Sequence, residues 1–160
     1  MNGMKRMFGR GMLAFAAIAL AACGDDSTGV EVVFEVIEET TFAPSLGVDL
    51  ETMQRTGTGV YYKDLVEGTG EPAVYGTTPT VTFTGWLTDG SEFDTGTFSF
   101  FMGNNRVILG FEDGLLGTRE GGTRLMVIPP NRGYGGQDLP GIPAGSVLVF
   151  EVTVDAVATN

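Results

Sequence analysis

Short segments of alternating apolar and polar residues, separated by glycine-containing turns, constrain the fold of this chain more than any other feature. The alternation is clearest in residues 80–87 and residues 146–157. Because successive side chains of a β-strand point to opposite faces, a two-residue period is typical of strands that bury one face. The residues expected on those buried faces are Val81, Phe83, Leu87, Leu148, Phe150, Val152 and Val154.

The remaining segments complete an α+β plan. Asp89 and Gly90 predict a hairpin turn that returns through Phe93. Residues 107–116 are the one good helix candidate in the core. Further strands are expected at residues 60–66, 98–102 and 123–128. Several antiparallel strands with one short helix indicate a bent sheet packed on that helix.

The residue types present and absent narrow the chemistry. The chain of 160 residues has no His and a single Cys, which excludes His-dependent triads, His-ligated zinc, disulfides within the chain and thiolate metal clusters. It carries 20 acidic against 9 basic residues, so the phosphate backbone of a nucleic acid would repel it. Acid–base chemistry would fall to carboxylates, Tyr or the backbone. We expect neither a nucleic-acid partner nor a metal.

The N-terminus resembles the export signal of a bacterial lipoprotein. Three basic residues within the first ten precede an apolar run over residues 11–22. That run is too short for a membrane-spanning helix, which needs roughly 20 apolar residues. It ends in LAAC at residues 20–23, which resembles the lipobox where signal peptidase cuts before a lipid-modified Cys. Residues 1–22 are therefore predicted to be a lipoprotein signal peptide.

Cleavage would leave Cys23 as a lipidated N-terminus, which would explain one unpaired Cys in an exported protein. The predicted location is the cell envelope, on the periplasmic side of a membrane, with the outer membrane favoured. A simple secretory signal with an incidental Cys is the alternative.

The chain that follows divides by composition. Residues 23–58 are interpreted as the lipidated N-terminus and a spacer, in which the alternation over residues 30–37 is compatible with an edge or extra strand. Signals of folded structure are stronger from Gly59 onward, so a folded domain is predicted over residues 59–160.

This domain carries a family resemblance. The motifs, in chain order, are VTFTG at 81–85, DGSEFD at 89–94, FSF at 98–100, VILGFEDG at 107–114, GGTR at 121–124, IPP at 128–130, YG at 134–135 and IPAGSVLVFE at 142–151. In order and spacing they resemble the FK506-binding-protein (FKBP) domain over roughly residues 60–157. The resemblance implies a half-barrel sheet wrapped around one short helix, and peptidyl-prolyl cis-trans isomerase activity without a metal or organic cofactor. Its implied partners are proline-containing polypeptides and FK506-type ligands.

Peptidyl-prolyl isomerisation is compatible with a chain that has no His and many Phe residues, because it needs no nucleophile. Resonance opposes rotation of a peptide bond by about 18 to 20 kcal/mol, and X–Pro bonds exchange over tens to hundreds of seconds. A twisted amide has lost that resonance and is less polar than the planar one. An aromatic, water-poor pocket can therefore favour the transition state without a nucleophile, which fits a chain with 11 Phe.

The resemblance also implies a set of site residues. The catalytic group would be Asp94, Tyr134 and Phe83, with the Asp94 carboxylate beside the rotating amide. The Tyr134 hydroxyl and the backbone N–H of Ile108 would bind ligand carbonyls. Phe111 stands where most members have a Trp that forms the pocket floor. The substrate-binding pocket would comprise Phe93, Phe98, Val107, Ile108, Phe111, Ile142 and Phe150.

Three departures from the family pattern leave two functions open. The position of Phe83 is usually a Tyr that hydrogen-bonds the Asp94 carboxylate. The link over residues 95–97 is short and has no basic partner for Asp94, and Leu139 replaces a His common in eukaryotic members. The chain is expected to be an isomerase acting on exported proteins. The alternative is a weakly catalytic or non-catalytic peptide-binding and chaperone module tethered to the membrane.

Overall fold

The computed structural model describes residues 31–159, which form one compact unit beginning at Glu31. The predicted signal peptide and Cys23 lie outside the described residues. Within residues 31–159, no helix has the length and apolar character needed to cross a bilayer. In the same range, no cluster of three or more His, Cys, Asp or Glu residues is placed to hold a metal ion.

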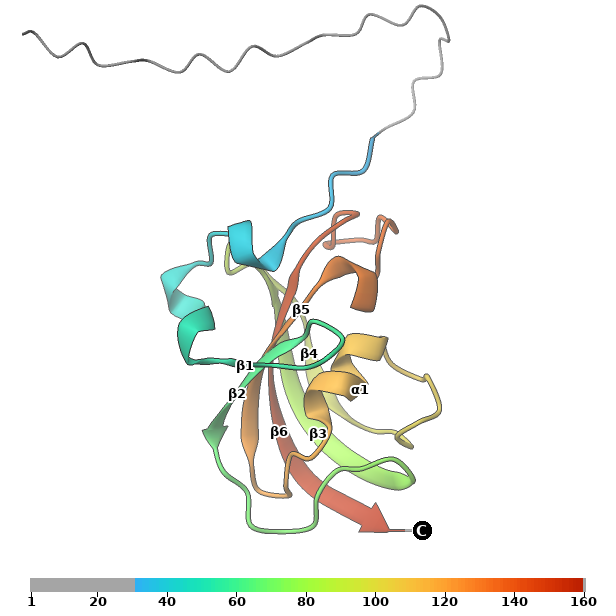
Figure 1. The fold of residues 1–160 in the computed structure, drawn as a ribbon. Helices are drawn as coiled ribbons and strands as arrows, with labels where there is room; N and C mark the ends of the chain where they lie inside the picture. Colours follow the sequence, from blue (N-terminus) through green and yellow to red (C-terminus); the bar gives the residue numbers. More distant parts are fainter. Residues whose placement is uncertain (1–30, 160) are drawn as a thin grey trace, which may run out of the picture. The chain divides into compact units, whose positions relative to one another are not determined.

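A single antiparallel sheet with one short α-helix forms the body of this unit (Figure 1). Its six strands lie in the order β1-β2-β5-β6-β3-β4. They are β1 Gln54–Arg55, β2 Tyr61–Val66, β3 Thr77–Leu87, β4 Glu92–Ser99, β5 Thr123–Ile128 and β6 Leu148–Thr159. The helix α1 spans Leu109–Leu115, and Figure 1 shows the long strands β3 and β6 curving past it. The predicted α+β class is confirmed.

Alternation along the two longest strands creates the face that packs on the helix. The predicted buried faces of β3 and β6 belong to one core cluster together with Phe111 and Leu115 of α1. Gly85 interrupts the β3 face because a Cβ there would lie 2.6 Å from the Phe93 ring and 2.8 Å from the Phe150 ring. The glycine therefore lets two aromatic rings pack directly against the backbone of β3.

The opposite face of the sheet is buried as well. Ile37 is only 3% exposed and clusters with Leu125, Val127 and Val149 on that face. Three 3₁₀ helices carry the chain across it: η1 Ile37–Glu39, η2 Pro44–Leu46 and η3 Leu50–Thr52. Residues 31–58 therefore fold onto the domain. The compact unit thus begins at Glu31, within the segment interpreted as a spacer.

The predicted strand over residues 30–37 is wrong in the part that the structure describes. Residues 31–36 have no regular secondary structure. Instead, the Glu35 N–H donates to Gly145 O at 2.9 Å, and the Val147 N–H donates to Glu35 Oε2 at 2.7 Å. The segment is thus hydrogen-bonded to the loop that precedes β6 and does not pair with a sheet edge.

The predicted strand over residues 98–102 is also corrected, because β4 ends at Ser99. Phe100 N–H still donates to Pro79 O at 3.2 Å, but Pro79 has no N–H with which to return the bond. The regular two-way bonding of the ladder is lost there, although the Met102 N–H still donates to Thr77 O at 3.0 Å. Residues after Ser99 lead into the loop before α1.

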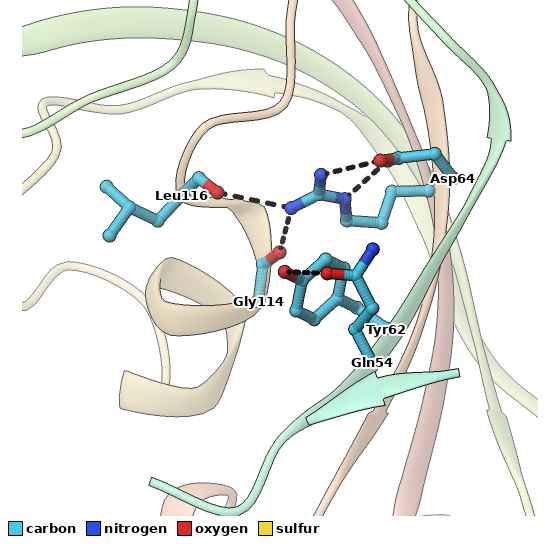
Figure 2. Close-up of polar contacts among 6 residues, drawn as sticks. Gln54, Tyr62, Asp64, Gly114 and Leu116 are labelled. Carbon is cyan, nitrogen blue, oxygen red and sulfur yellow. Dashed lines mark hydrogen bonds and ion pairs between the residues drawn. The ribbon is translucent and has the colours of Figure 1, made fainter. Parts of the chain in front are cut away.

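Arg124 of β5 joins the C-terminal end of α1 to the sheet through hydrogen bonds to Gly114, Leu116 and Asp64, three residues labelled in Figure 2. Arg124 is 6% exposed, and its Nη1 donates to Gly114 O at 2.9 Å and to Leu116 O at 3.1 Å. The last carbonyls of an α-helix have no partner within the helix. The buried guanidinium therefore satisfies two acceptors that the short helix itself leaves free.

The same guanidinium is held from the side of β2. It donates to both carboxylate oxygens of Asp64, at 2.6 Å and 3.0 Å, and lies 4.4 Å from the centroid of the Tyr62 ring. The Tyr62 hydroxyl in turn donates to Gln54 of β1 at 3.0 Å, as Figure 2 shows. One buried cation therefore connects the helix to three strands.

Candidate active site

A pocket of about 620 Å³ opens beside α1 and collects most of the predicted site residues. Nine of the ten line it, namely Phe83, Phe93, Asp94, Phe98, Val107, Ile108, Phe111, Tyr134 and Phe150. Ile142 does not line the pocket. It is 7% exposed and packs into the adjoining core.

Phe111 forms the centre of the aromatic part of this pocket. Its ring centroid lies 5.4 Å from Phe150, 6.0 Å from Phe98 and 6.2 Å from Phe83. The contacts with Phe150 and Phe83 are edge-to-face, an arrangement that aromatic quadrupoles favour. Rings from β3, β4, α1 and β6 therefore meet in one apolar floor.

Two polar side chains of the predicted set stand in the pocket wall. Burial raises the pKa of the Tyr134 hydroxyl, and the nearby negative charge of Asp94 raises that pKa further. The hydroxyl is therefore neutral and able to donate at physiological pH. Within residues 31–159, neither Asp94 nor Tyr134 makes a side-chain hydrogen bond, so both are available to a ligand.

Contacts outside the pocket fix the positions of the two segments that carry Ile108 and Tyr134 into its wall. Arg132 of η4, Pro130–Arg132, forms an ion pair with Asp113 on α1, which sets the position of the chain just before Tyr134. The buried Glu112 accepts a hydrogen bond from the Gly103 N–H at 3.1 Å and so holds the loop that leads to Ile108. The helix thus fixes the segments on both sides of the pocket.

The pocket also contains residues that sequence reasoning did not select. Residues 95–97 of β4 form part of the wall, where the Thr95 hydroxyl donates to Phe83 O at 3.0 Å. Asn105 and Arg106 line the mouth. Their place directly before the VILGF motif was a usable signal, because the loop had to approach the pocket to deliver Val107.

A sequence model described as FKBP-type peptidyl-prolyl cis-trans isomerase matches residues 70–155. The chain belongs to this FKBP family. It is 40% identical over 100 residues to the FK506-binding protein of Neisseria meningitidis serogroup B, covering 59% of this chain and 92% of that protein. It is 42% identical over 98 residues to FK506-binding protein 3 of Candida albicans, covering 59% of this chain. The chain spans only 22% to 32% of the length of three fungal relatives.

Solved structures show the same FKBP fold. The crystal structure of FkpA from Escherichia coli superposes with a TM-score of 0.62 at 35% identity, covering 68% of this chain and 53% of that one. The crystal structure of AtFKBP13 gives a TM-score of 0.60 at 30% identity, covering 66% of this chain and 98% of that one. All of residues 31–58 precede the family match, which begins at residue 70, so their packing on the sheet is an addition to the matched FKBP core.

Phe83→Tyr tests how Phe83 relates to the FKBP pocket. The half-buried ring faces the cavity, so the added hydroxyl should reach the pocket and leave isomerase activity unchanged or raised. Unfolding in urea should show a stability change below about 1 to 3 kcal/mol, the usual cost of overpacking. Phe100→Tyr is the control, because that residue is only 6% exposed and does not line this pocket, so its added hydroxyl would have little access to water. An equal or larger loss for Phe83→Tyr would show that position 83 faces closed core.

Proposed function

We propose that this chain accelerates cis-trans rotation of X–Pro bonds in exported proteins, binding the proline segment in the pocket around Phe111. The observation that carries the proposal is the composition of that pocket. An aromatic floor is combined with two polar side chains, Asp94 and Tyr134, that have no hydrogen-bond partner among the described residues. FKBP family membership supports the same reaction.

The proposed mechanism uses the pocket to lower the energy of the twisted amide. A planar amide loses hydration when it enters an aromatic cavity, whereas the less polar twisted amide loses less. The Tyr134 hydroxyl donates to one substrate carbonyl. The Ile108 N–H makes no backbone hydrogen bond within residues 31–159, and it donates to a second carbonyl. These two donors fix the chain on either side of the bond that rotates.

Asp94 acts on the rotating group itself. Its carboxylate lies in the pocket wall, and its charge is among the causes that raise the pKa of the Tyr134 hydroxyl. Twisting the bond stops the nitrogen lone pair from donating into the carbonyl group, so the carbonyl carbon becomes more electron-poor. A negative charge beside that carbon stabilises the twisted state. The contribution is therefore made in the transition state more than in the bound ground state.

The test of the activity is a proline-limited refolding assay with the chain from Gly24 onward. The protein should accelerate the slow phase, and an FK506-type inhibitor should abolish the acceleration.

The second candidate function is a binding module with little turnover, favoured by the absence of a hydroxyl at Phe83 and of a cation paired with Asp94 among the described residues. Binding of proline peptides without acceleration would select it.

Tyr134→Phe is expected to weaken ligand binding about two- to twelvefold. The variant removes one hydrogen bond with a net contribution of about 0.5 to 1.5 kcal/mol and keeps the ring. Affinity can be measured by titration calorimetry with an FK506-type ligand. Since the pKa of Tyr134 is raised above 10.0, wild-type affinity should not fall between pH 6 and pH 9 through loss of this proton.

The matched variant Asp94→Leu should depress turnover more than affinity. Equal effects of both variants on affinity would contradict these separate roles.

The proposed location is the cell envelope, with Cys23 lipidated after removal of residues 1–22. In cells the wild-type protein should partition into the membrane fraction, and Cys23→Ser should shift it to soluble or unprocessed forms. Fractionation after membrane extraction with high salt measures this. Identical membrane partitioning of a Cys23→Ser chain and a processed wild type would rule out the lipid anchor.

A further inference from the structure

A second, smaller hollow of about 430 Å³ adjoins the FKBP pocket. It shares three lining residues with the pocket, Phe98, Arg106 and Val107. The two hollows therefore have a common wall. A polypeptide with its proline in the pocket can continue into the second hollow without leaving the protein surface.

Two aromatic side chains, Phe100 and Phe101, line the second hollow. Phe100 is buried, whereas Phe101 is 42% exposed. Aromatic residues are enriched at protein interaction surfaces relative to the rest of the surface. Phe101 offers contact area to an apolar side chain of an extended client.

Arg106 stands between the two hollows and has no partner. Within residues 31–159 it makes neither a hydrogen bond nor an ion pair, although acidic residues outnumber basic ones 20 to 9 in the chain. Every other basic side chain in that range is engaged, in the pairs Arg55–Glu38, Lys63–Thr52, Arg119–Gly70, Arg124–Asp64 and Arg132–Asp113. The one unpaired cation of the described chain thus lies at the mouth of the pocket.

We propose that Arg106 selects client segments that carry an acidic residue close to the bound proline. This inference rests on the proposed isomerase function and adds a substrate preference to it. An extended chain advances about 3.3 to 3.6 Å per residue, so a side chain one to three residues from the proline reaches a shared wall. No acidic residue lines the second hollow, and only Asp94 lines the pocket. A client carboxylate directed to Arg106 therefore gains an ion pair, and a client Lys there is repelled.

The test compares peptides of equal length that place Glu, Gln or Lys two residues from a single proline, on either side in turn. Exchange NMR measures kcat/KM for isomerisation and titration measures affinity. With the wild-type protein, Glu should exceed Gln about 1.5- to 5-fold on one side of the proline, the range of an exposed ion pair. The ratio should shrink at 0.5 M salt, where screening is strong.

Variants assign the preference to one side chain. Arg106→Gln should bring the Glu/Gln ratio to about 1, and Arg106→Glu should favour the Lys peptide. Arg119→Gln is the matched control, because Arg119 is also exposed but lies outside both hollows. It should keep the wild-type ratio.

Two failures are distinguishable. Equal treatment of Glu and Gln peptides by the wild type, or a ratio that survives Arg106→Gln, overturns the inference and leaves the isomerase function intact. Absence of both binding and turnover for every peptide, the Gln peptide included, overturns the proposed function and the inference with it.

Discussion

Replacing Arg124 by Met is expected to lower the free energy of unfolding by about 3 kcal/mol. Removing one partner of a buried ion pair typically costs 3 to 5 kcal/mol, and the lower end applies because the Asp64 side chain is 35% exposed and can regain water. Most of the loss comes from the carbonyls of Gly114 and Leu116, which lose their donor at the end of α1. Urea unfolding followed by circular dichroism measures the change.

Two control substitutions separate charge from geometry. Arg124→Lys keeps the positive charge but cannot donate to Asp64 and to two carbonyls at once, so it should recover only part of the loss. Arg119→Met removes an exposed Arg and should change stability by less than about 0.5 kcal/mol. If Arg124→Met were no more destabilising than Arg119→Met, the helix would not depend on this cation.

Phe111→Ala is expected to cost about 3 to 5 kcal/mol of stability and to remove most binding of FK506-type ligands. Truncating a buried Phe loses its transfer free energy and leaves a cavity. Here the ring is the meeting point of Phe83, Phe98, Phe100 and Phe150, so four aromatic neighbours lose a contact. The pocket floor would open into the core at the same time. Thermal or urea unfolding and ligand titration test the two effects separately.

Phe111→Trp is the informative comparison, because the resemblance to the FKBP domain implies a Trp at this floor position. It keeps an aromatic floor and should retain ligand binding even where overpacking lowers stability by about 1 to 3 kcal/mol. Phe34→Ala truncates a ring that is exposed and should have a small effect. Retained ligand affinity in Phe111→Ala would show that the ring supports the core without forming the binding floor.

Local sequence pattern was sufficient for the main strands. The alternation in residues 80–87 and 146–157 identified β3 and β6, and the pattern placed their apolar faces correctly. The order of motifs predicted nine residues that line one pocket. In a strand that buries one face, apolar residues recur at every second position. The pattern that identifies such a strand is therefore contained in a few neighbouring residues.

Local sequence pattern did not predict how the second face of the sheet is covered, because the covering segment is distant in the chain. Leu125, Met126, Val127 and Ile128 form a continuous apolar run in β5 that is buried on both faces of the sheet. This run is the sign in the sequence of the second core, which residues 37–53 cover. That sign does not reveal what covers the second face. Short 3₁₀ helices have no extended period, and the spacer interpretation followed from their polar composition.

By itself, the sequence determined the α+β class, the faces of the long strands, the family and the aromatic character of the pocket. Only the tertiary structure decided that residues 31–58 close the second face of the sheet, that Arg124 satisfies the end of α1, that Ile142 lies in the core beside the pocket and that Arg106 stands unpaired at its mouth. The physical reason is the range of the interactions. The period of buried residues can be seen in a few neighbouring positions of the sequence. The partner of a charge or of an apolar face depends on how segments far apart in the chain pack together.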